Sequence, residues 1–268
     1  MVQPALIDTQ LTDRMNEVKA SGLMLDRSTF EGRRTYNSLK QSIDKLLAES
    51  PSTYYTLKSQ LGALCYDVAE VRSAAAGLSA LTSFSDGSVL NTVRSLVVVG
   101  QYNEAYELFT RYSDRMRESD FPGEVMWLAA AGFFAGWLVD FREDVTRMKL
   151  ALDKHLQARV DQIYSASAVD VSEHDVREML GYAVRAFAKS KKHILFTDVH
   201  VIEDGLLFEL VGRIGSEEAA SIEWDYAGML AQHFPDAPTD RVSISICSYP
   251  ENVEAVLPAA VARPDQLS

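Results

Sequence analysis

The stretch LKSQLGALCYDVAEVRSAAAGL, residues 57–78, determines the fold class of this chain. Its apolar residues recur at alternating spacings of four and three positions, which is a heptad pattern. The apolar positions are Leu57, Leu61, Leu64, Val68, Val71, Ala75 and Leu78. This spacing places them on one side of an α-helix, so the pattern predicts a helix with one buried face.

The same periodicity continues upstream and predicts helices over residues 5–25, 29–49 and 51–80. Ser28 and Glu31 have the spacing of a capping box, and Pro51 follows Ser50 as the first helical residue. We interpret the apolar faces as surfaces that pack together in a helical bundle. An exposed coiled coil that binds a partner is the alternative.

A second pattern follows the loop at residues 81–88. A turn glycine, an aromatic residue, a small residue and a second aromatic residue stand at fixed offsets, namely Gly100, Tyr102, Ala105 and Phe109. This segment resembles one helical hairpin of the tetratricopeptide type. A weaker copy has Gly132 and Phe141 in matching places but departs from the pattern at Val139 and Asp144. The resemblance covers about residues 86–155.

The resemblance implies a binding groove lined by the first helix of each hairpin. The protein-binding residues would then be Arg94, Val97, Phe133 and Trp137. Two hairpins are fewer than a free-standing solenoid normally needs, so a bundle and a tetratricopeptide-like superhelix both stay open. Phe133 and Trp137 could also simply fill a core.

The apolar stretch Trp127–Val139 predicts a central core helix, with a partner or oligomer interface as the alternative. A long helix is expected from Asp140 to Tyr164. Ser165–Ala168 is the best linker candidate, and a further helix is expected from Ser172 to Lys189.

The apolar period then changes from helical to two. Residues 194–203 and 206–214 flank Asp204–Gly205, which predicts a hairpin with Glu203 facing Leu206. In that register Val199 faces Leu210 on an apolar side, and His200 faces Glu209 on the other. A helix to about His233 and a third strand at residues 242–247 complete a β-β-α-β unit with a three-stranded sheet.

The sequence therefore predicts an α+β protein that is predominantly helical in its N-terminal part. Residues 1–164 would form a helical domain, residues 170–258 a small α+β domain, and residues 259–268 a flexible tail.

Asp198, His200 and Glu209 form the densest group of acid–base or metal-ligating residues. We interpret them as a surface pair on the solvent side of the sheet, with a metal or small-ligand site as the alternative. No nucleophile elbow, phosphate loop, dinucleotide fingerprint or zincin motif occurs. Cys65 is expected in the core and Cys247 on the sheet face opposite the core. We expect no metal and no cofactor.

The net charge of the chain limits the classes of partner that it is expected to bind. Lys and Arg number 26 against 38 Asp and Glu, a net charge of −12, and the excess lies mainly in the last third. A negative field repels nucleic acids and anionic membrane surfaces, and no apolar run is long enough for a membrane span. Two distant cysteines and the lack of a leader pattern predict a cytoplasmic protein.

These patterns together predict a non-enzymatic adaptor, regulator or chaperone-like protein that binds another protein through its helices. The acidic last third favours a partner with a basic surface, and Trp127–Val139 offers a route to a homo-oligomer. The alternative is an enzyme or a small-ligand or metal sensor that uses the sheet face around Asp198, His200 and Glu209.

Overall fold

The computed structural model describes residues 4–21, 23–148 and 152–249. Within these residues the helices before the sheet are α1 (Pro4–Ala20), α2 (Phe30–Asp44), the 3-10 helix η1 (Lys45–Leu47), α3 (Pro51–Leu64), α4 (Val68–Ser79), α5 (Asp86–Val98), α6 (Tyr102–Arg111), α7 (Ser113–Arg117), α8 (Pro122–Ala131), α9 (Ala135–Met148), α10 (Lys154–Ala166) and α11 (Glu173–Ala188). The sheet region contains β1 (Ile194–Ile202), β2 (Gly205–Gly212), α12 (Ser216–His233) and β3 (Val242–Ser248). The predicted α+β class is confirmed.

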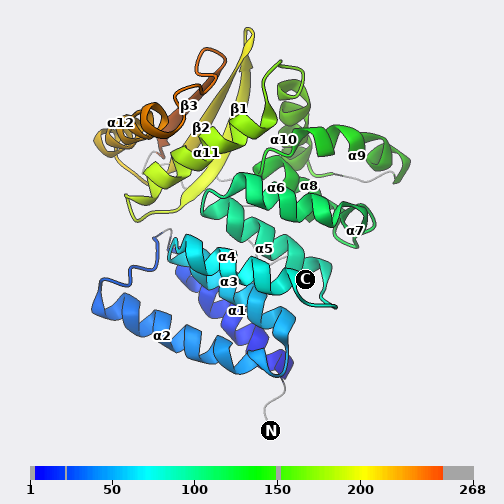
Figure 1. Cartoon of the computed structure of the whole chain (residues 1–268), viewed down its shortest axis with the longest axis vertical. Coiled ribbons are helices and arrows are strands. Elements are labelled where there is room, and N and C mark those ends of the chain that lie inside the picture. The colour runs from blue at the N-terminus through cyan, green and yellow to red at the C-terminus, as the bar shows by residue number, and fades with distance from the viewer. Residues whose placement is uncertain (1–3, 22, 149–151, 250–268) are drawn as a thin grey trace.

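The helices stack in pairs along the molecule, from α1 and α2 at one end to the sheet and α12 at the other (Figure 1). The first helices of successive pairs form a row in which α3 contacts α5, α5 contacts α8, α8 contacts α10 and α10 contacts β1. Small hydroxyl residues line the contact between α3 and α5, where Ser59 Oγ lies 3.2 Å from Ser95 Oγ. The description as a tetratricopeptide-like superhelix stays a prediction.

The helix expected over residues 51–80 is two helices, so that prediction was wrong. The chain turns between α3 and α4, where Tyr66 adopts a left-handed φ of 54°. Asp67 then begins α4, because its side chain accepts a hydrogen bond from the Glu70 amide. Gly62 lets the two helices touch, since a Cβ there would lie 2.9 Å from Val71. The predicted apolar residues thus divide between two clusters, with Leu57, Leu61 and Leu64 packed with α1 and α2, and Val71 in the large cluster.

Other predicted helix limits were also wrong. The stretch Trp127–Val139 breaks after Ala131, and Phe133 has a left-handed φ of 53° before α9 begins. The expected helix from Asp140 to Tyr164 is likewise divided: its first residues form the end of α9, and its last residues form most of α10. Asp153 starts α10 by accepting hydrogen bonds from two backbone amides. The first helix ends at residue 20 rather than 25, and α2 is capped by Thr29 rather than by Ser28.

The sheet has the order β1-β2-β3, with β1 antiparallel and β3 parallel to β2. The hairpin register was predicted wrongly, because the turn residues are Glu203 and Asp204, and Val199 pairs with Phe208. This two-position shift leaves each side chain on its predicted face, since strand side chains alternate. Val199, Phe208 and Leu210 are accordingly buried.

One large apolar cluster links the helices to the sheet. It runs from Ala63 to Ile246, and the rings of Phe133 and Phe208 meet in it at 5.2 Å. A smaller cluster joins α1, α2 and α3 around Leu39 and Leu61. The predicted division into residues 1–164 and 170–258 stays a prediction. The expected tail at 259–268 lies outside the described residues.

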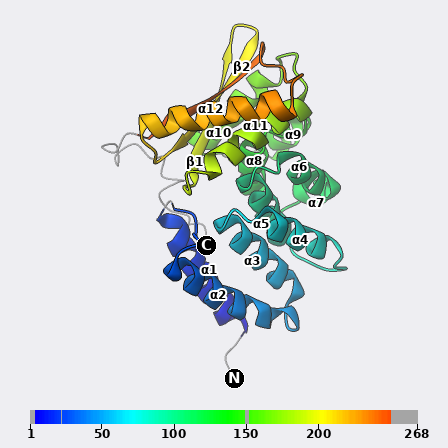
Figure 2. The same ribbon diagram turned by 60° about the vertical axis from the view of Figure 1, so that its left-hand side comes forward.

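Helices α11 and α12 run side by side on one face of the sheet (Figure 2). That face carries the buried side chains Phe208, Leu210 and Ile246. The other face carries Asp198, His200 and Glu209, which are only half-buried. In the described part of the chain no helix combines the length and the apolar character needed to cross a membrane.

Candidate functional site

The predicted groove residues divide between the core and the surface. Phe133 and Trp137 are 3% and 5% exposed, and Val97 is buried as well. The Trp137 ring stacks on Phe141 with centroids 4.7 Å apart. Arg94 alone keeps a substantial part of its side chain, 30%, in contact with solvent. The folded chain therefore presents Arg94 and encloses the two aromatic groups.

Trp127 is a large aromatic residue that lies at the surface beside Arg94. It is 44% exposed on α8, and the Arg94 guanidinium carbon lies 5.7 Å from its ring centroid. Arg94 also donates to Asn91 Oδ1 at 3.0 Å and lies 3.7 Å from Glu124. We call these four side chains, Asn91, Arg94, Glu124 and Trp127, the Arg94–Trp127 face.

A second cationic group, Lys19, lies near Arg94 in this face. Burial and repulsion from Arg94 lower the pKa of Lys19, whose side chain still meets solvent. Burial and the Lys19 charge lower the pKa of His193 to about 4. The His193 Nε2 atom is buried without a hydrogen-bond partner. Two segments distant in sequence thus bring the positive charges of Lys19 and Arg94 together in a chain whose net charge is −12, while His193 is neutral near pH 7.

The sequence did not predict Trp127 as a surface residue, because the residues around it are apolar. The spacing of residues along α8 does indicate its exposure. Glu124, Trp127 and Ala131 share one side of α8, while Val125 and Leu128 on the other side are fully buried. A single acidic residue at that spacing indicates which side of an apolar helix meets water.

The metal-ligating group predicted from the sheet pattern is brought together by the fold. His200 Nε2 lies 3.2 Å from Glu209 Oε2 and 3.8 Å from Asp198 Oδ2. The predicted cross-strand pairing was wrong in detail, because Asp198 pairs with Glu209 and His200 with Leu207. The contact between His200 and Glu209 is therefore diagonal.

The two cysteines have different surroundings. Cys65 ends α3 and is half-buried, and burial raises the pKa of its thiol to about 12. A thiol with such a pKa stays protonated near neutral pH and is a poor nucleophile. Cys247 lies on the same sheet face as Glu209, with Sγ 4.0 Å from Glu209 Oε1. The prediction that Cys247 faces away from the core agrees with this contact.

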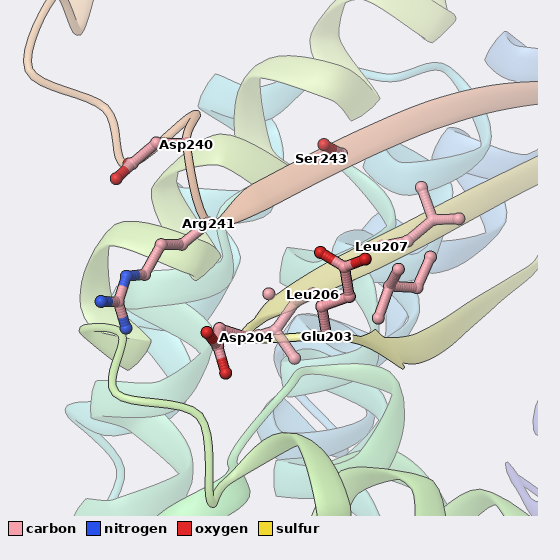
Figure 3. Close-up of a pocket in the computed structure, with 9 residues that line it drawn as sticks. Glu203, Asp204, Leu206, Leu207, Asp240, Arg241 and Ser243 are labelled. Atoms are coloured by element: carbon pink, nitrogen blue, oxygen red, sulfur yellow. The ribbon is translucent and has the colours of Figure 1, made fainter.

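A cavity of about 370 Å³ opens at the end of the sheet, between the hairpin turn and the start of β3 (Figure 3). Its charged residues are Glu203, Asp204, Asp240 and Arg241, all exposed. Leu206 donates its amide to the Arg241 carbonyl at 2.7 Å and closes the base of the cavity. Exposed charges on two loops favour hydration over a fixed ligand geometry. The cavity therefore offers a weaker candidate than either side-chain group.

A scan against models of known protein families gave no match, and searches of curated proteins and of solved structures also found none. Function is therefore argued from the residues alone.

Proposed function

We propose that this chain is a non-enzymatic protein-binding module whose contact surface is the Arg94–Trp127 face. The observation that carries the proposal is a half-exposed tryptophan that lies beside an arginine, on two helices whose other large apolar side chains are mostly buried. Tryptophan and arginine are the residue types that most often dominate the energy of protein interfaces. A partner side chain packed on Trp127 would remove its remaining apolar surface from water.

The partner that fits this face presents an acidic segment. Lys19 and Arg94 repel each other in the unbound chain, and each has a lowered pKa because protein atoms displace water around it. In the described residues Lys19 forms no ion pair, and Glu124 reaches Arg94 only at 3.7 Å. A carboxylate placed between the two cations would relieve this repulsion and could accept a bidentate bond from the guanidinium.

The sequence also predicted a partner with a basic surface, on the basis of the acidic last third. That prediction concerns the sheet end of the molecule and not the Arg94–Trp127 face. The predicted homo-oligomer through Trp127–Val139 can now use only the exposed side chains of that stretch, Trp127 and Val139. Size-exclusion chromatography with light scattering, on the wild type and on Trp127→Ala, tests it.

A peptide array tests the proposed function directly. The array contains acidic peptides with one apolar anchor, and the same peptides with every acidic residue replaced by lysine. We expect the acidic set to bind and the basic set not to bind. Trp127→Ala and Arg94→Ala should each weaken binding by about 2 kcal/mol, which is roughly thirtyfold in Kd.

Trp224→Ala is the matched control, because Trp224 is 81% exposed on α12 and lies outside the proposed face. This variant should bind as the wild type does. Arg94→Lys separates charge from shape, since lysine keeps the charge but loses the planar group that covers the indole. Equal binding of acidic and basic peptides, or full binding by Trp127→Ala, would contradict the proposal.

A further inference from the structure

The open face of the sheet gathers four metal-ligating side chains from three strands. Asp198 and His200 lie on β1, Glu209 on β2 and Cys247 on β3. Asp198, His200 and Glu209 each offer one donor atom, and these three atoms all lie within 4.8 Å of one another. Each of these side chains is half-buried, so a small ion can reach them from solvent.

Two of the three separations among these donors are close to those around a single small cation. Ligand bonds of about 2.0–2.2 Å meeting at a tetrahedral metal hold neighbouring donors roughly 3.3–3.6 Å apart. The observed separations from His200 Nε2 are 3.2 Å to Glu209 Oε2 and 3.8 Å to Asp198 Oδ2. Small side-chain rotations that move these atoms by a few tenths of an ångström would make the two separations equal. An ordinary surface pair requires only the first of these two contacts.

Asp198 is held in the orientation that a ligand requires. Its Oδ1 atom accepts a bond from Arg159 at 2.9 Å and one from the Val199 amide at 3.0 Å. These two donors leave Oδ2 directed towards His200. Outer hydrogen bonds of this kind fix carboxylate ligands in metal sites. The second of these bonds also satisfies the Val199 amide.

Cys247 supplies a donor of a different kind. Its Sγ lies 4.0 Å from Glu209 Oε1 and 3.9 Å from Ser245 Oγ. Burial raises the pKa of this thiol, and the nearby Glu209 and Glu223 carboxylates raise it further, so it must lose a proton to ligate. A set of one imidazole, two carboxylates and one thiolate suits Zn²⁺ better than the hard cations Mg²⁺ and Ca²⁺.

We propose that Asp198, His200 and Glu209 form a binding site for one divalent transition-metal ion of the Zn²⁺ class, in departure from the sequence-based expectation of no metal. Cys247 Sγ lies outside the 4.8 Å group, so its side chain rotates towards the ion to become the fourth ligand. The site is independent of the Arg94–Trp127 face. It would tie the three strands together on the side that α11 and α12 leave open, and would stabilise the sheet by mass action.

Calorimetric titration of the chelator-treated full chain with Zn²⁺ tests the site. We expect saturable binding of one ion per chain. His200→Ala and Glu209→Gln should each weaken it by about a hundredfold or more, since outer partners alone are worth about ten- to a hundredfold. Both side chains are half-exposed, so the metal-free variants should melt near the wild-type temperature, and circular dichroism checks this.

His174→Ala is the control, because His174 Nδ1 lies 3.3 Å from Asp175 Oδ1 in an exposed pair on α11 that lacks further donors. Its Zn²⁺ affinity should equal that of the wild type. The absence of one-to-one binding, or binding that survives His200→Ala, would overturn the site. Co²⁺ tests the thiolate separately: a sulfur-to-cobalt charge-transfer band should appear and vanish in Cys247→Ser. A Co²⁺ complex without that band would overturn Cys247 as a ligand.

Discussion

Trp127 and Trp137 belong to one apolar stretch, yet the fold gives them opposite environments. Trp127 is 44% exposed on α8, whereas Trp137 is 5% exposed on α9, between Phe109 and Phe141. The chain breaks between them, where Phe133 takes a left-handed conformation and turns α9 back against the core. The break between α8 and α9, rather than local hydropathy, therefore determines which tryptophan can contact a partner.

The largest expected effect separates the two tryptophans by stability. Trp137→Ala should lower the free energy of unfolding by about 3–5 kcal/mol, because it removes a buried ring. Trp127→Ala should lower it by under about 1 kcal/mol, which is the range of an exposed cation–π contact. Urea unfolding followed by far-UV circular dichroism measures both. Similar losses in the two variants would erase the distinction between core and surface.

The next effect concerns the turn between α5, which carries Arg94, and α6. Gly100 has a φ of 74°, and a Cβ there would lie 2.9 Å from the Gly181 carbonyl oxygen on α11. Gly100→Ala should therefore cost about 1–3 kcal/mol of stability. Gly87→Ala is the control, because the nearest atom to its Cβ, Ser85 Oγ, is 3.8 Å away. A neutral Gly100→Ala would show that the turn tolerates a side chain.

The pH dependence of stability tests the burial of His193 beside Lys19. Burial and Lys19 lower the folded-state pKa of His193 from 6.5 to about 4. The unfolded chain then binds more protons, so stability is full above pH 6.5 and falls as the pH drops towards 4, by about 3 kcal/mol. His193→Gln should lose less stability than the wild type over this window, and His174→Ala should lose the same amount. Parallel curves of stability against pH for the wild type and His193→Gln would contradict the lowered pKa of His193 and would place its side chain in solvent.

How far the sequence predicts this fold depends on the residue type at each break. The periodicity found the buried positions of α3 and α4, but it joined them because Tyr66 is not a residue that marks a turn. Phe133 concealed the break between α8 and α9 in the same way. Both residues have positive φ values, which non-glycine side chains rarely adopt. Tertiary packing holds these turns, so local preference cannot reveal them.

The candidate sites show the same limit. Alternation along the strands was enough to place Asp198, His200 and Glu209 on one face, because a two-position shift of register preserves faces. Arg94, the single charge among apolar neighbours, keeps 30% of its side chain in contact with solvent, and its role in binding stays a prediction. The exposure of Trp127 was not predicted, since it depends on where α8 ends and how it packs against α5. Lys19 approaches Arg94, and His193 approaches Lys19, only through the tertiary fold.

The smallest expected effect tests the corrected hairpin turn. Glu203 has a φ of 53°, a left-handed conformation that costs a non-glycine residue stability. Glu203→Gly should raise the free energy of unfolding by about 0.5–1 kcal/mol. Glu203→Ala removes the same charge but keeps the Cβ, so it should give no gain. An equal gain from both variants would assign the effect to charge instead of to backbone conformation.

The most direct test of the central claim observes Trp127 alone. The chain contains three tryptophans, so Trp137→Phe with Trp224→Phe leaves Trp127 as the single indole. Titrating this variant with an acidic peptide that binds the wild type should shift the indole emission to shorter wavelength and reduce its quenching by acrylamide. Binding with unchanged emission and unchanged quenching would contradict the account, because the partner would then contact a surface other than the Arg94–Trp127 face.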